Sequence, residues 1–415
     1  MTSPTRIDAD WLRAEPLQRL LSALSENGEE ARVAGGAVRN ALMKRDATDI
    51  DVATTVLPQE TIRRAEAAGF RAVPTGIEHG TITVVTPGGP FEVTTLREDI
   101  ETDGRRAVVR FGRDWKRDAE RRDFTINALY ADKDGAVLDL VGGIKDIEAG
   151  VLRFVGDPET RIREDYLRTL RFFRFFAWYG SGRPDAAGLR ASARLKDGLS
   201  RLSAERVWME LRKLLAAPDP SRALLWMRQA GVLTAVLPES EKWGIDAIHL
   251  LTQAEAALGW PADALLRLQA IVPPDPERMV AMAGRLKLSN AERDRLLAWT
   301  QADKPDPAMA DGALRARLFF GDRQAILDRL RLALASARGR AAGGAPDALA
   351  EAAALSRQLD IASRFDPPAF PVSGSDVVAA GTPAGPEVGR AIDRLKRLWV
   401  DGGFVMSRED LLARL

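Results

Sequence analysis

The chain has 415 residues, 46% of them hydrophobic and 29% charged, and a length that predicts about two to four domains. It has no cysteine and two histidines, which excludes disulfides, thiol catalysis and metal centres built from several histidines or cysteines. Any metal ion would therefore be held by carboxylates, which favour a hard cation such as Mg²⁺. No apolar run approaches the roughly 18 residues of a membrane span, and residues 1–16 lack the apolar core of a signal peptide. We expect a cytoplasmic protein with no membrane partner.

The predicted elements change in character along the chain. The first 150 or so residues mix helices with short β-type runs that are bounded by turns rich in Gly, Pro and Asp. The expected strands cover residues 33–34, 49–54, 81–86, 91–96 and 137–138. Beyond residue 158 the strand signals fade, and a helical periodicity rich in Ala, Leu and Arg runs nearly to the end. The pattern predicts an α+β fold, in which a head with a mixed sheet and helices precedes an all-α remainder.

A glycine pair and two aspartates form the first candidate site. Residues 35–39 (GGAVR) indicate a strand-to-helix turn, where the backbone of Gly36 comes close to a phosphate and Arg39 would neutralise its charge. Asp49 and Asp51 stand two residues apart in an expected strand. Side chains two positions apart in a strand point to the same face, so these two carboxylates lie side by side. Two carboxylates so placed hold two Mg²⁺ ions roughly 3.5–4 Å apart, the spacing of in-line phosphoryl transfer. This pattern predicts Asp49 and Asp51 as catalytic metal ligands.

Each half of this pattern also has a plain structural explanation. A glycine pair is common in tight turns, and an Asp-x-Asp often marks an acidic strand end. The combination is far more specific than either half. A third catalytic carboxylate is expected from a neighbouring strand, where Glu92 stands between Phe91 and Val93. A glutamate that only faces solvent is the alternative there, and both interpretations stay open.

These segments, together with others in the same order, resemble the family of class II tRNA nucleotidyltransferases and bacterial poly(A) polymerases, within the polymerase β-like superfamily. The resemblance is clear over roughly residues 30–240 and returns more weakly at 373–412. Besides the metal motif it rests on residues 74–81 (PTGIEHGT), 91–97 (FEVTTLR), 121–128 (RRDFTINA), 139–146 (DLVGGIKD), 164–171 (EDYLRTLR) and 203–213. Asn40 stands where the family usually has Asp, which is a mild departure.

The resemblance implies an enzyme that adds CMP and AMP to the 3′ end of tRNA without a nucleic-acid template. Its substrates would be CTP and ATP, two Mg²⁺ ions would assist, and no obligate protein partner is evident. The implied domains are a polymerase β-like nucleotidyltransferase head (1–150), a helical neck that selects the nucleotide (151–215), a helical body (216–335) and a helical tail (336–415). Body and tail would bind the RNA by its shape and its phosphates, because an A-form helix hides its bases in a narrow groove.

A charged run in the expected neck suggests how the base is chosen. Asp165, Arg168 and Arg171 recur every three residues, so on a helix they share one charged half. Cytosine and adenine both present an amino donor beside a ring-nitrogen acceptor, which an Asp acceptor beside an Arg donor complements. Uracil and guanine present the reverse and would leave polar groups unpaired.

The resemblance assigns this base-selecting role to Asp165 and Arg168, with Arg171 and Arg174 supporting the base or the phosphates. The alternative is a solvated helix face with ordinary ion pairs, Asp165 to Arg168 and Glu164 to Arg168.

The resemblance also assigns a nucleotide-binding role to residues 121–128, which we call the second motif. Arg122 would face the sugar or the triphosphate, and Asp123 would order it by ion pairing, with a helix N-cap as the alternative role for Asp123. The basic stretch at residues 105–116 lies where the family carries a flexible loop that is needed to switch from C to A addition. A solvated loop is the alternative.

Three other functions remain open from the sequence. A poly(A) polymerase of the same family shares the metal and base-selecting motifs. A partial enzyme would add only CC or only A. A non-catalytic RNA-binding module would lack activity altogether, although the intact Asp49, Asp51 and Asp165 speak against it.

Overall fold

The computed structural model describes residues 5–47, 49–102, 107–241 and 244–415, and the chain forms two compact units, Met1–Pro238 and Glu239–Leu415. The first unit has a mixed sheet followed by helices, and the second is helical, so the predicted α+β class is confirmed. The expected boundary between neck and body, after residue 215, coincides with the end of helix α9, whereas the expected boundary between body and tail lies inside helix α17. No helix in the described parts of the chain is long and apolar enough to span a membrane.

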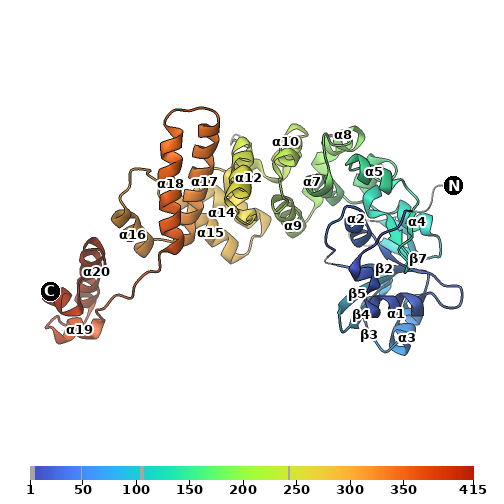
Figure 1. The fold of residues 1–415 in the computed structure, drawn as a ribbon, viewed down its shortest axis with the longest axis horizontal. Helices are drawn as coiled ribbons and strands as arrows, with labels where there is room; N and C mark the ends of the chain where they lie inside the picture. The colour runs from blue at the N-terminus through green and yellow to red at the C-terminus, as the bar shows by residue number, and fades with distance from the viewer. Residues whose placement is uncertain (1–4, 48, 103–106, 242–243) are drawn as a thin grey trace. The chain divides into compact units, whose positions relative to one another are not determined.

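The strands all belong to the first unit (Figure 1). They are β1 (Ala31–Ala34), β2 (Asp51–Thr54), β3 (Arg71–Gly76), β4 (Thr81–Thr86), β5 (Gly89–Thr95), β6 (Arg97–Thr102), β7 (Ala107–Phe111), β8 (Leu129–Ala131) and β9 (Val137–Asp139). The helices and 3₁₀ turns (η) of the head are η1 (Asp10–Arg13), α1 (Glu15–Leu24), α2 (Gly36–Leu42), α3 (Pro58–Ala67), η2 (Ile77–His79), α4 (Trp115–Glu120), η3 (Thr125–Asn127) and α5 (Gly143–Ala149).

Seven of these strands form one sheet in the order β3-β4-β5-β2-β1-β8-β9, and β6 pairs with β7 in a separate ribbon. Within the seven-stranded sheet β2 and β5 run parallel, and the other neighbours are antiparallel. The expected strands at 33–34, 81–86, 91–96 and 137–138 are therefore present within a residue or two. The expected strand at 49–54 begins only at Asp51, so Asp49 lies in the segment that leads into it.

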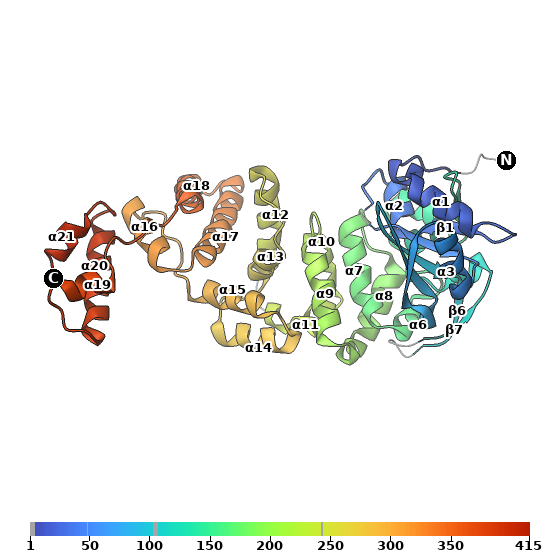
Figure 2. The same ribbon diagram turned by 90° about the horizontal axis from the view of Figure 1, so that it is seen from below.

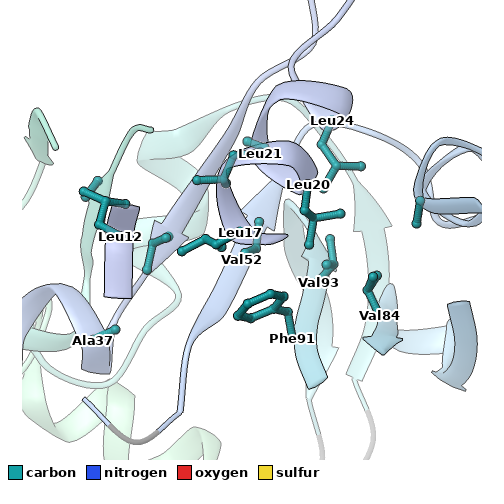
Figure 3. Packing of buried hydrophobic residues seen from close by; sticks show 14 of the residues in the cluster. Leu12, Leu17, Leu20, Leu21, Leu24, Ala37, Val52, Val84, Phe91 and Val93 are labelled. Atoms are coloured by element: carbon teal, nitrogen blue, oxygen red, sulfur yellow. The ribbon is translucent and has the colours of Figure 1, made fainter. Parts of the chain in front are cut away.

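The register of the sheet separates its two faces. Val33, Val52 and Val93 pair across β1, β2 and β5, and all three pack into the core beneath α1 and α3. Helix α1 contributes leucines at the i, i+3, i+4, i+7 spacing of a helix face, and Figure 3 shows them above Val52 and Val93; they are Leu17, Leu20, Leu21 and Leu24. The adjacent register row, which contains Asp51 and its β5 partner Glu92, therefore points to the opposite face of the sheet.

Helices complete the first unit after the head. They are α6 (Pro158–Glu164), α7 (Leu167–Tyr179), α8 (Ala186–Leu195), η4 (Lys196–Arg201), α9 (Ala204–Leu215), α10 (Ser221–Gln229) and α11 (Val232–Val236), with η5 (Pro238–Ser240) at the boundary. Asp157 caps α6 by accepting from the Thr160 N–H at 2.8 Å, and Pro158 occupies the first turn, where a missing N–H costs nothing. Helix α7 packs against both α9 and α10, and Figure 2 shows the three side by side.

An aromatic cluster joins the head to α7. Phe124, within the second motif, packs edge-on against Phe175 with ring centroids 5.4 Å apart. Phe154 stacks on Phe172 at 5.3 Å. Phe124, Phe154 and Phe172 are fully buried, so this contact holds the segment around Phe124 against α7.

The second unit consists of α12 (Asp246–Leu258), α13 (Ala264–Ile271), α14 (Pro276–Leu286), α15 (Asn290–Gln301), α16 (Asp311–Phe320), α17 (Arg323–Ala342), α18 (Ala348–Arg364), α19 (Gly374–Ala379), α20 (Pro386–Asp401) and α21 (Arg408–Leu412). The long helices α17 and α18 lie side by side (Figure 1) and share a core that includes Leu330, Leu334, Leu355 and Leu359. A second core gathers α19, α20 and α21 around the buried Trp399.

Candidate active site

A cleft of about 760 Å³ lies within the first unit, and both motifs of the head and the neck helices α7 and α9 line it. Its walls hold Gly35, Gly36, Ala37, Arg39, Asn40, Ala47, Asp49, Asp51, Arg121, Arg122, Asp123, Asn127, Asp165, Leu167, Arg168, Arg171, Arg174, Phe175, Tyr179, Arg206 and Lys213. All the predicted site residues except Glu92 are on this wall. Residues that lie up to 178 positions apart in the sequence, from Gly35 to Lys213, are thus brought to one cavity.

The glycine pair forms the turn that the sequence predicts. Gly35 has φ of +70°, a left-handed conformation that favours glycine, and α2 begins at Gly36. A Cβ on Gly35 would lie 3.1 Å from the Nη1 atom of Arg122. The missing side chain therefore lets the second motif come directly against the turn.

Asp49 and Asp51 line the cleft together. Asp51 is the first residue of β2, and its register partner on the parallel strand β5 is Glu92. Partial desolvation, and then the negative charges of Glu92 and Asp49, raise the pKa of Asp51 above its usual value, while Arg122 opposes the shift. Carboxylates that repel one another in this way are stabilised by a divalent cation, and their oxygen donors suit a hard ion.

Glu92 belongs to this carboxylate group by its electrostatic effect on Asp51, but it is exposed and does not line the cleft. Among the described residues no three His, Asp or Glu side chains converge as a metal site. Asp49 and Asp51 are the carboxylates of the cleft that could hold such a cation, and Mg²⁺ commonly takes phosphate oxygens and water as its other ligands.

The second motif is held by Asp118, an acidic residue of α4 that lies before it in the chain. Arg122 donates from Nε and Nη2 to Asp118 Oδ2 at 3.3 and 3.2 Å, and Arg121 donates from Nε to Asp118 Oδ1 at 2.8 Å. The Tyr130 hydroxyl also donates to Asp118, at 2.6 Å. The expectation that Asp123 orders Arg122 by ion pairing is wrong. Arg122 pairs with Asp118, which lies one helical turn before it, and Asp123 pairs with Arg171.

Asp123 instead pairs with the neck. Its Oδ2 atom accepts from Arg171 Nε at 2.7 Å, and its Oδ1 atom accepts from Asn127 Nδ2 at 3.1 Å. Burial works to raise the pKa of Asp123, but Arg171 and Asn127 outweigh it and lower the pKa. The alternative role of Asp123 as a helix N-cap is also wrong, because Phe124 occupies the N-cap position of η3.

Asp165 lies in a break between two helices rather than on one. Helix α6 ends at Glu164, Asp165 has extended backbone angles (φ −153°, ψ 108°), and α7 begins two residues later at Leu167. Its Oδ1 atom accepts from the Leu167 N–H at 3.1 Å, and its Oδ2 atom accepts from Arg206 Nη2 at 2.6 Å. The predicted single helix face that carries Asp165, Arg168 and Arg171 is therefore wrong.

The expected ion pairs of this segment are found in part. Arg168 pairs with Glu164, one turn away, and its Nη2 atom approaches the Arg121 carbonyl oxygen at 3.4 Å. The Asp165 to Arg168 pair is absent, because the break turns Asp165 towards Arg206 of α9. Asp165 and Arg168 nevertheless line the same cleft, so an acceptor and a donor still face the same space.

Arg171 and Arg174 are also held by carboxylates. Arg171 pairs with Asp123, and Arg174 donates from Nε to Glu210 Oε2 at 2.6 Å. The Arg174 guanidinium lies 4.1 Å from the Phe175 ring centroid, within the range of a cation–π contact. These pairs fix both arginines along the α7 wall.

Arg39 has a different setting from the one expected of a phosphate ligand. It is buried, and its guanidinium donates to Asn127 Oδ1, to Asn40 Oδ1 and, at 2.8 Å, to the Tyr179 hydroxyl. Burial lowers the pKa of Arg39. Asn40, the departure from the family pattern, accepts from Arg39 and donates to the Asp46 carbonyl oxygen. Arg39 therefore ties α2 to the second motif and to the end of α7.

Several cleft residues were missed as site residues in the sequence analysis. Arg121 and Asn127 lie inside the second motif, and Arg206 and Lys213 lie inside the neck segment at 203–213. Membership of these segments was the available signal. Tyr179 carries no such signal, because only the packing of α7 against the head reveals it.

The basic stretch at 105–116 is described only in part. Arg105 and Arg106 lie outside the described residues, and β7 begins at Ala107. At the base of the β6–β7 ribbon Arg113 donates to Glu29 Oε1 at 2.5 Å and to the Gly28 carbonyl oxygen at 2.7 Å.

Comparison with known proteins agrees with this arrangement. Residues 31–153 match the model of the poly(A) polymerase head domain, and residues 186–243 match a model described as the probable RNA and SrmB-binding site of polymerase A. The chain is 32% identical to the mitochondrial CCA tRNA nucleotidyltransferase 1 of Danio rerio, over 97% of this chain and 91% of that protein. It is 31% identical to the CCA-adding enzyme of Geobacillus stearothermophilus, over 95% of both chains.

The fold also matches a solved relative. The crystal structure of the Bacillus stearothermophilus CCA-adding enzyme in complex with CTP superposes with a TM-score of 0.74 at 29% sequence identity, covering 96% of each chain. The similarity thus extends over head and helical parts alike.

Proposed function

Because this chain belongs to the family of CCA tRNA nucleotidyltransferases and poly(A) polymerases, we propose how its own residues add CMP and AMP to the 3′ end of tRNA. The chain is a nucleotidyltransferase that uses CTP and ATP and adds CCA without a nucleic-acid template. The observation that carries the residue assignment is the shared cleft, where the Asp49 and Asp51 carboxylates and the Asp165 and Arg168 pair line one cavity.

The chemical step belongs to the Asp49 and Asp51 end of the cleft. Nucleotidyltransferases of this family depend on divalent metal ions, and we assign two Mg²⁺ ions to these carboxylates, where they would activate the RNA 3′-hydroxyl and stabilise the departing pyrophosphate. The 3′-oxygen attacks the α-phosphorus of the incoming nucleotide, a phosphodiester bond forms, and the bond to pyrophosphate breaks. Glu92, through its charge beside Asp51, would strengthen the attraction of the site for cations.

The triphosphate would lie along the glycine turn and the second motif. The left-handed Gly35 lets Arg122 come close to the turn, so Gly36 and Arg122 line the cleft together, where both would meet phosphate. Asp118 holds the Arg122 guanidinium in place, so it would meet the phosphates without a rearrangement. Arg39 would support this wall from behind through Asn127 and contribute positive charge rather than a direct contact.

The base would be read at the other end of the cleft. Asp165 Oδ2 accepts from Arg206, which leaves further lone pairs of its carboxylate for the amino group of cytosine or adenine. Arg168 would donate to the ring nitrogen beside that amino group. Arg171 and Arg174, fixed by Asp123 and Glu210, would keep this wall rigid. Uracil and guanine would meet Asp165 with a carbonyl oxygen, which is repulsive.

The helical second unit would bind the rest of the tRNA, and the division into neck, body and tail stays a proposal. The cytoplasmic location expected from the sequence also stays a prediction, since the Danio rerio relative is named as a mitochondrial protein.

One assay tests the proposed function. The purified chain is incubated with Mg²⁺, CTP and ATP and with tRNAs that end before CCA, after C or after CC, and the product lengths are read. We expect each tRNA to be completed to CCA and extension to stop there. Long A tails would indicate a poly(A) polymerase, products that stop at CC or that grow only from CC would indicate a partial enzyme, and retained binding without extension would indicate a binding module.

A further inference from the structure

The cations on the cleft wall differ in how their charge is compensated. Six of its arginines have carboxylate partners, which are Asp118 for Arg121 and Arg122, Glu164 for Arg168, Asp123 for Arg171, Glu210 for Arg174 and Asp165 for Arg206. Lys213 lines the same cleft, is exposed, and has no carboxylate partner in the described parts of the chain. Arg39 also lacks a carboxylate partner among the described residues, but it is buried and hydrogen-bonded to Asn127, Asn40 and Tyr179. Lys213 is therefore the exposed cleft cation whose charge is least compensated by the protein.

Lys213 lies on the same face of α9 as Arg206, the partner of Asp165, and two turns further along the helix. Arg206, Glu210 and Lys213 follow one another at i, i+4 and i+7 on α9, so they share the face that packs against α7. Arg206 contacts Asp165, Glu210 contacts Arg174, and the Lys213 carbonyl oxygen accepts from Trp178 Nε1 at 3.0 Å. Lys213 is thus about 10 Å along the helix from Arg206, at 1.5 Å per residue.

The end of α7 beside Lys213 also contacts the segment that leads to the proposed metal-binding carboxylates. Tyr179, which follows Trp178, lines the cleft and is hydrogen-bonded to Arg39 of α2. Asn40 and Ala47 also line the cleft, and Ala47 stands two residues before Asp49. Arg45, in the segment between α2 and β2, donates to the Trp178 carbonyl oxygen at 2.7 Å, and Trp178 in turn contacts the Lys213 backbone. Lys213 therefore lies at the end of α7 that meets the segment leading to Asp49.

Two polyanions must enter this cleft, the incoming nucleotide and the RNA whose 3′-hydroxyl attacks it. The nucleotide base is assigned to the Asp165 end, and its triphosphate to the glycine turn and Arg122. We propose that Lys213 binds a backbone phosphate of the last nucleotides of the RNA primer and guides the 3′-hydroxyl to Asp49 and Asp51. This inference rests on the proposed function and adds a primer-binding residue to it. A lysine suits the task, because a flexible point charge holds a phosphate while the primer advances after each addition.

The test compares Lys213→Gln with Lys145→Gln and Lys213→Arg in the full chain. Lys145 is an exposed lysine on α5 that does not line the cleft, so its variant is the matched control. With a tRNA ending in CC and ATP, we expect Lys213→Gln to raise the KM for tRNA about three- to tenfold, as the loss of one partly screened phosphate contact would. The KM for ATP stays unchanged, Lys145→Gln behaves as the parent chain, and Lys213→Arg restores most of the loss.

Salt dependence gives an independent readout. Binding of the same tRNA is titrated between 50 and 200 mM KCl, and we expect the slope of log K against log salt to fall by about 0.7 in Lys213→Gln, the value for one contact to a single-stranded phosphate. An unchanged KM for tRNA with an unchanged slope would overturn the proposal, and so would a raised KM for ATP, which would assign Lys213 to the triphosphate. If the parent chain extends no tRNA, the proposed function fails, whereas an active parent chain with an indistinguishable Lys213→Gln variant refutes only this inference.

Discussion

Two groups of carboxylates share one cleft, yet their electrostatic surroundings are opposite. Asp51 has Glu92 and Asp49 as its charged neighbours, and partial desolvation with these like charges raises its pKa. Asp123 is buried, whereas Asp51 is exposed, but Arg171 lowers the pKa of Asp123 despite that burial. Of these two aspartates, Asp51 is therefore placed to attract cations, whereas the charge of Asp123 is already compensated by Arg171.

This difference in charged neighbours distinguishes two roles for a carboxylate, metal binding and base recognition, which composition and motifs alone do not distinguish. Carboxylates that repel one another gain most from an added divalent cation, so the Asp49 and Asp51 end suits the chemical step. Carboxylates held by arginines form a rigid, directional set of donors and acceptors, which suits reading a base at Asp165 and Arg168. The contrast makes three predictions, of decreasing size.

The largest effect is expected where like charges meet. Asp51→Asn should lower incorporation of both CMP and AMP by roughly 10³-fold or more, because the transition-state charge loses its stabilisation. Single-turnover rates with saturating tRNA measure this loss. Asp134→Asn, an exposed carboxylate in a head turn outside the cleft, is the control and should keep parental rates. Parental activity in Asp51→Asn would contradict the assignment of Asp51 to the chemical step.

An intermediate effect is expected at the neck end. Asp165→Ala should reduce the preference for C and A over U and G by about 10- to 100-fold, the cost of one or two buried polar groups left unpaired. Competition between labelled CTP and UTP on a tRNA lacking CCA measures the ratio. Asp197→Ala, at an exposed residue of η4, should leave it unchanged. An undiminished preference in Asp165→Ala would show that the base is selected elsewhere.

The smallest effect concerns the support of the second motif. Asp118 is fully buried; burial works to raise its pKa, but Arg121, Arg122 and Tyr130 outweigh it and lower the pKa. Because the pKa of Asp118 is lower in the folded chain, its ionised carboxylate stabilises the fold at pH values above its unfolded pKa, which is near 4. This stabilisation is lost as the pH falls through the folded pKa. Asp118→Asn should therefore destabilise the head by about 2 kcal/mol at pH 7, since both arginines remain partly hydrated.

That difference between parent and Asp118→Asn should shrink as the pH falls below about 4. Hydrogen exchange of residues 115–122, followed from pH 7 to pH 3 in both chains and corrected for the intrinsic exchange rate, measures it locally. A difference that stays constant or grows in acid would contradict the assigned ion pairs.

Local patterns predicted much of the head and of the site. The glycine pair dictates a turn, and the Asp-x-Asp after it predicted Asp49 and Asp51 on one cavity wall. Alternation of apolar residues located β4 and β5, since each has one buried face. Strand β3 carries few buried residues, and β8 is only three residues long, so neither leaves a clear period-2 signal.

The pairing of the charged residues could not be predicted in the same way. Asp165 fits a helical spacing with Arg168, but the chain breaks there, and its partner Arg206 is 41 residues away on another helix. Arg122 forms its ion pair with Asp118, four positions earlier, rather than with its neighbour Asp123. Such partners depend on how α7 packs against α9 and against the head, which spacing within one segment does not reveal.

Asp49 and Asp51 are proposed to hold the divalent ions, and Mn²⁺ binding tests this assignment most directly. Electron paramagnetic resonance titrates Mn²⁺ into the parent chain, Asp49→Asn and Asp51→Asn, each with a non-hydrolysable CTP analogue present. We predict that either substitution weakens binding by about 10-fold or more, since even the loss of an outer-shell partner of a metal ligand costs about 10- to 100-fold. Equal Mn²⁺ affinity in all three chains would contradict the account.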